Sequence, residues 1–150
     1  MEVMVCRTLE EFYRSMSPEE LLEEYYSGLF STANATLGLI DGNGKAPGRD
    51  SVMLLERAVD NAISAQSLFE KGSGGYVFIA QSSGDIKRYM DSFPPIKAVL
   101  DQITIRSCNC ADILHESGAI PQILNVPSGA ITEAKAIVDN IKNKLGYGQN

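Results

Sequence analysis

Two hydroxyl side chains and a glycine stand together near the middle of the chain, in residues 81–85 (QSSGD). Small residues at the start of a helix leave backbone amides open to an anion, and the two hydroxyls add short hydrogen-bond donors. The segment therefore predicts that Ser82, Ser83 and Gly84 bind a small anionic metabolite. A serine that only caps a helix produces the same pattern. Asp85 can cap the same amides with its carboxylate, so a loop that caps itself and holds no ligand is the alternative.

A second glycine-rich segment, residues 41–49 (DGNGKAPGR), has the strongest turn signal in the chain. Its Gly-Lys pair resembles part of a P-loop, but that motif needs Ser or Thr where Ala46 stands. A dinucleotide fingerprint needs a third glycine where Pro47 stands. We therefore expect no cofactor. We predict Gly42 and Gly44 as ligand-binding residues, with a simple tight turn as the alternative.

His115 and Glu116 are the clearest candidates for proton transfer, and His115 is the single histidine of the chain. Histidine titrates near neutral pH, so this pair is our prediction for catalytic residues. A partly buried histidine without a chemical role is the alternative. Cys108 and Cys110 precede them, but a one-residue gap is not zinc-ligand spacing and no second histidine is present. We predict no metal site.

Charge and cysteine usage exclude several classes of protein. The chain has 150 residues and a net charge of −6, which disfavours binding to nucleic acid or to an anionic membrane surface. Residues 1–40 carry seven acids and two bases, so a surface that tolerates an anion must come later in the chain. Three cysteines are too few for a disulfide framework, which indicates a reducing cytoplasm. The apolar runs are far shorter than the ~20 residues that cross a bilayer.

Helix signals are clear in three segments of the chain. Ser17 and Glu20 form a capping-box pattern with proline between them, which predicts a helix from residue 18. Apolar residues at helical spacing predict further helices over 51–70, which a glycine run ends, and over 131–145, which Gly146 ends. A shorter helix is expected over 8–14.

Between these helices, short apolar runs alternate with helical segments. We predict strands at residues 37–40, 76–80, 103–105 and 120–126, and helices at 85–92, 94–101 and 110–117. Such alternation is typical of parallel βαβ units. The expected fold is a single α/β domain over residues 1–150. It has a three-layer parallel sheet of four to five strands with helices on both faces, and a helical N-terminal segment, 1–34, packed on it.

Several of these segments resemble the sugar isomerase (SIS) domain, a phosphosugar-binding family. Residues 37–44 are similar to its first strand and glycine-rich loop, residues 79–85 to a strand with its serine-rich loop, and residues 104–126 to later elements. Three phosphate-binding positions depart from the family: serine is replaced by Ala46 and Gln81, and threonine by Ile86. The resemblance implies a Rossmann-like fold and a phosphosugar ligand, with phosphate capture weakened.

Two functions follow from this reading. In the first, the domain binds a small phosphorylated metabolite and isomerises it through His115 or Glu116. In the second, it is a regulatory or protein-interaction subunit without chemistry, which contacts its partner through apolar residues of the first long helix. Those residues are Leu21, Tyr25, Tyr26, Leu29 and Phe30. Crowding of Tyr25, Tyr26 and Phe30 at one end of that helix also predicts a homo-oligomer.

Overall fold

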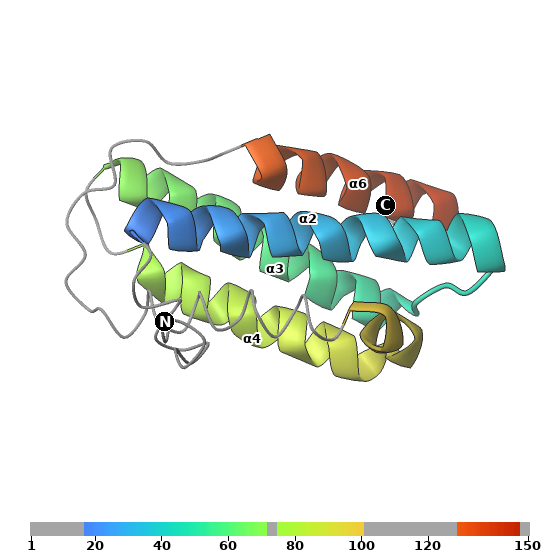
Figure 1. The fold of residues 1–150 in the computed structure, drawn as a ribbon. Helices are drawn as coiled ribbons and strands as arrows, with labels where there is room; N and C mark the ends of the chain where they lie inside the picture. Colours follow the sequence, from blue (N-terminus) through green and yellow to red (C-terminus); the bar gives the residue numbers. More distant parts are fainter. Residues whose placement is uncertain (1–16, 72–74, 101–128, 148–150) are drawn as a thin grey trace, which may run out of the picture.

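The protein is a bundle of long helices (Figure 1). The computed structural model describes residues 17–71, 75–100 and 129–147. Four long helices lie in these ranges: α2 (Pro18–Asn43), α3 (Arg49–Glu70), α4 (Tyr76–Ser92) and α6 (Gly129–Leu145). Residues 94–100 form a shorter helical stretch after α4.

The predicted α/β fold is wrong, because the described ranges are helical and hold no strand. Residues 37–40 belong to α2, and residues 76–80 form the first turns of α4. An apolar run of four or five residues does not distinguish a strand from one segment of a partly buried helix. The Rossmann-like fold implied by the SIS resemblance is wrong for the same reason. The predicted elements at 8–14, 103–105, 110–117 and 120–126 lie outside the described residues.

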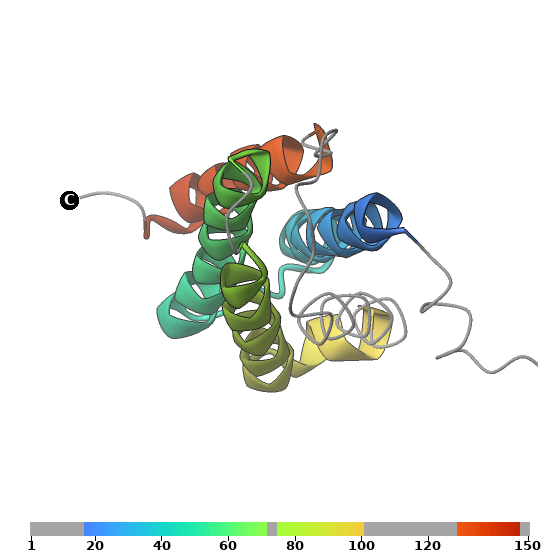
Figure 2. The ribbon, with the colours of Figure 1, turned by 90° about the vertical axis from the view of Figure 1, so that its left-hand side faces the viewer.

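The helices pack in a defined order around a shared core. α3 packs on α4 and also on α6, and α2 packs chiefly on α6. Seen from the end of the bundle, α3 lies between α6 and α4, and α2 stands across from them (Figure 2). The core is made of the buried apolar side chains that all four helices contribute.

Both ends of α2 follow from its local sequence. The Ser17 hydroxyl accepts a hydrogen bond from the Glu20 amide at 3.1 Å, and the Ser17 amide donates to the Glu20 carboxylate at 2.8 Å. The predicted capping box and helix start are thus confirmed. At the other end, Gly44 adopts a left-handed conformation with φ of 67°, which glycine tolerates best. The Lys45 amide then donates to the Leu39 carbonyl, and the predicted bend becomes the turn into α3.

The apolar side chains that we expected to contact a partner lie in the core instead. Tyr25 and Tyr26 are fully buried and Leu21 and Leu29 almost so, while Phe30 is partly buried against the same cluster. The four buried side chains belong to the core of the bundle and form no exposed apolar surface on α2. Within the described ranges, no helix combines the length and the apolar character needed to span a membrane.

Candidate functional site

The two predicted ligand-binding serines lie inside the bundle. The Ser82 hydroxyl donates to the Ala58 carbonyl of α3 at 2.6 Å and also pairs with the Tyr25 hydroxyl of α2 at 2.5 Å. Ser83 is 2% exposed, and its hydroxyl has no hydrogen-bond partner among the described residues. Because residues 82–85 lie within α4 rather than at its start, their amides belong to the helix hydrogen-bond pattern. Residues 82–85 therefore offer no free amides of a helix N-terminus to an anion.

The other predicted site residues are not brought to these serines. Gly42 lies near the end of α2, almost five turns beyond Tyr25, the residue that touches Ser82. At 1.5 Å per residue this separation is about 25 Å. Gly44 is the cap that follows. Catalytic candidates His115 and Glu116, and the cysteines Cys108 and Cys110, lie outside the described residues.

One predicted residue, Gly84, does line a pocket on the outer side of α3 and α4. This α3–α4 pocket has a volume of about 270 Å³. Its walls are formed by Arg57, Asn61, Ala80, Gln81, Gly84, Asp85 and Arg88. A side chain at position 84 would enter this space, since a Cβ built there lies 3.7 Å from an Nη atom of Arg88. The glycine therefore helps to keep the pocket open.

A buried carboxylate forms the base of the α3–α4 pocket. Asp85 is 2% exposed, and its Oδ2 atom accepts a hydrogen bond from the Asn61 side chain at 3.0 Å. Its Oδ1 atom accepts a hydrogen bond from Arg88 and lies 3.7 Å from Nη2 of Arg57. Burying a carboxylate is costly unless it is paired and hydrogen-bonded, and these three side chains meet that requirement.

The two arginines extend from Asp85 into solvent. Their side chains are 60% and 59% exposed, while both line the α3–α4 pocket. A guanidinium group has five N–H donors, and one carboxylate uses only some of them. Two positive charges face one negative charge here, which leaves a local excess of one positive charge in a protein of net charge −6. The pocket is therefore suited to an anion.

Sequence reasoning missed Arg57, Asn61 and Arg88 as site residues. A helical reading of residues 49–70 already places Arg57 and Asn61 on one face, four residues apart. Gly84 and Arg88 share a face in the same way, but only if residues 76–92 are read as one helix. Because residues 76–80 were assigned to a strand, Gly84 and Arg88 were not recognised as neighbours on one helix face.

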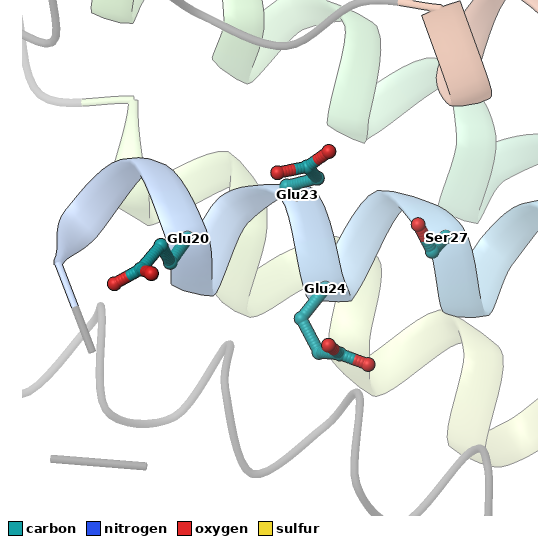
Figure 3. Close-up of a pocket in the computed structure, with 4 residues that line it drawn as sticks. All are labelled: Glu20, Glu23, Glu24 and Ser27. Carbon is teal, nitrogen blue, oxygen red and sulfur yellow. The ribbon is translucent and has the colours of Figure 1, made fainter. Parts of the chain in front are cut away.

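A second pocket, of about 310 Å³, lies on the first turns of α2 and is lined by Glu20, Glu23, Glu24 and Ser27. Figure 3 shows Glu23 and Glu24 pointing to different sides of the helix, so the carboxylates do not converge on one point. Glu20 already accepts a hydrogen bond from the Ser17 amide. Among the described residues, no group of acidic, cysteine and histidine side chains is arranged to hold a metal ion.

A third pocket, the Met53 pocket, has a volume of about 240 Å³ and is lined by Asp50, Met53, Leu54 and Arg57. Arg57 belongs both to this pocket and to the α3–α4 pocket, so the two pockets adjoin along α3.

No protein-family model, curated protein or solved structure matches the chain.

Proposed function

We propose that this protein is a binding domain that receives an anionic group of its ligand in the α3–α4 pocket. The observation that supports this proposal is the pair of exposed guanidinium groups, Arg57 and Arg88, above the buried Asp85. Guanidinium groups bind phosphate and carboxylate through two parallel hydrogen bonds, which fixes the orientation of the anion.

Asp85 does not require both arginines. Asn61 already donates to one of its oxygens and Arg88 to the other, whereas Arg57 stays 3.7 Å away. The Arg57 side chain, which comes from α3, is therefore the more available of the two for a ligand. Gln81 lines the same pocket and can add an amide donor to an anion or accept a hydrogen bond from a hydroxyl.

A small phosphorylated metabolite meets these requirements. Its phosphate fits between the arginines, and a pocket of about 270 Å³ leaves room for a few more polar atoms beside Gly84 and Gln81. A reducing cytoplasm, which the cysteine content indicates, is the compartment in which we expect the protein to meet such a ligand.

Isothermal titration calorimetry with inorganic phosphate and with a hexose phosphate tests the proposal. We expect millimolar or tighter binding, and at least a tenfold loss of affinity in Arg57→Gln, which corresponds to ~1.4 kcal/mol. Lys71→Gln is the matched control, because Lys71 is an exposed cation after α3 that does not line the pocket. Urea unfolding of each variant shows whether the fold persists. Absence of binding by the wild-type protein, or equal losses in both variants, contradicts the proposal.

A further inference from the structure

We propose that the anionic group belongs to a peptide segment of a partner protein, and that an apolar side chain of the same segment packs in the Met53 pocket. This inference rests on the proposed function of the α3–α4 pocket. It names the kind of ligand that the two adjoining pockets fit together.

The Met53 pocket adds an apolar surface directly beside the arginines. Met53 is 49% exposed, although it is one of the large apolar side chains of α3. Leu54 lies next to it and is partly buried against the core. Methionine adapts to differently shaped apolar groups, which makes it common on peptide-binding surfaces. An apolar side chain seated here would remove Met53 from water.

The order of charges along α3 specifies the ligand further. Asp50 begins the surface, Met53 and Leu54 follow, and Arg57 ends it beside Arg88. Asp50 and Arg57 are seven positions apart, which corresponds to about 10 Å along the helix axis. In an extended peptide, side chains two residues apart share a face and lie about 7 Å apart, so three alternate side chains cover that distance. The complementary segment therefore carries a basic residue opposite Asp50, an apolar residue opposite Met53 and an acidic residue opposite Arg57, with one residue that faces away between each pair.

A free sugar phosphate can make contact with only part of this surface. It can bind the arginines, but it offers no apolar group for Met53 and no cation for Asp50. A peptide with all three groups uses both pockets, and its two opposite charges determine which end lies over which pocket. The charge pattern thus favours a peptide over a metabolite as the complete ligand.

The probe for this proposal is the peptide Lys-Ala-Leu-Ala-Asp with both ends blocked, titrated into the 150-residue chain and followed by NMR. We expect shifts of the Met53 methyl and Arg57 side-chain signals, and a weaker affinity when the aspartate of the peptide is replaced by asparagine. Met53→Ser should weaken peptide binding about fivefold, because the apolar contact is lost. The same variant should leave phosphate binding unchanged.

Val99→Ser is the matched control, since Val99 is a comparably exposed apolar residue that lines neither pocket. It should leave peptide affinity unchanged, whereas Arg57→Gln should weaken both peptide and phosphate binding. If phosphate binds and the peptide does not, or if Met53→Ser has no effect on the peptide, the inference is wrong and the proposed function stands. If neither probe binds, both are wrong.

Discussion

Hydrogen bonds between buried hydroxyl groups of different helices account for Ser82, one of the two serines that looked like ligand donors. Ser82 joins Tyr25 of α2 to Ala58 of α3, and Thr36 of α2 pairs with Tyr89 of α4 at 2.5 Å. Both pairings join residues more than fifty positions apart in the chain. Local sequence cannot show such partners, so a serine in a tertiary hydrogen bond looks the same as one that binds an anion.

Replacing Tyr89 tests how much such a pairing stabilises the fold. In Tyr89→Phe, the Thr36 hydroxyl still donates to the Thr32 carbonyl at 2.9 Å, so only the hydrogen bond between the two hydroxyls is lost. We expect the free energy of unfolding to fall by ~1 kcal/mol. Urea unfolding at neutral pH measures this loss.

The same variant should change the pH dependence of stability. Burial raises the pKa of Tyr89, and the hydrogen bond with Thr36 lowers it only in part. The stability from the neutral phenol is therefore fully present below the unfolded pKa of about 10 and declines as the pH rises above it. Tyr89→Phe should show a smaller decline between pH 9 and pH 11, values chosen to bracket that pKa of about 10. An identical decline in both proteins would mean that Tyr89 does not titrate differently on unfolding.

At the level of elements, the helices with regular apolar spacing were the predictable ones. Residues 51–70 and 131–145 keep a helical period throughout, and α3 and α6 match them to within two residues. The α4 segment lacks this clarity, because a glycine and two serines interrupt its apolar residues. It packs extensively against α3, and sequence spacing does not reveal such packing.

Gly75 controls how closely α4 approaches α3. A Cβ atom at this position would lie 2.5 Å from the Ala65 carbonyl oxygen and 3.1 Å from the Phe69 ring. Gly75→Ala should therefore destabilise the protein by about 1–3 kcal/mol, because a backbone oxygen cannot move aside without shifting a helix. Thermal unfolding measures the effect.

Gly38→Ala is the control for this substitution. Gly38 lies within α2 with no atom close to an added Cβ, so alanine there should stabilise the helix by about 0.5–1 kcal/mol. Opposite signs for the two variants are expected. If Gly75→Ala is as stable as the wild-type protein, the two helices are not held at this distance by the glycine.

At the scale of the whole molecule, ion pairs connect α6 to its neighbours. Lys142 donates to Glu56 of α3 at 2.6 Å, and Lys144 lies 3.3 Å from Asp41 of α2. Lys135 lies within 4 Å of Glu56, Asp60 and Asp139. Net charge was readable from the sequence, and an anion-tolerant surface after residue 40 stays a prediction. Which cations are engaged between helices depends on the packing.

Lys135 provides a test of this ion-pair network. Burial lowers the pKa of Lys135, but the hydrogen bond to Asp60 and the charges of Asp60, Asp139 and Glu56 outweigh that effect and raise it. The stabilisation is therefore fully present below the ordinary lysine value of about 10.5 and is lost as the pH rises through the higher folded value. In urea unfolding, Lys135→Gln should lower the midpoint at pH 7, where the lysine is charged.

Salt separates the contribution of the network from that of ordinary packing. Because Lys135 is about one-third exposed, we expect a loss below ~1 kcal/mol that shrinks in high salt. Lys97→Gln removes a single pair with the well-exposed Asp91 and should change the midpoint less. A loss in Lys135→Gln that is equally large in low and high salt would assign the effect to the packing of the lysine stem. The charge of Lys135 would then not contribute to the binding of α6 to α3.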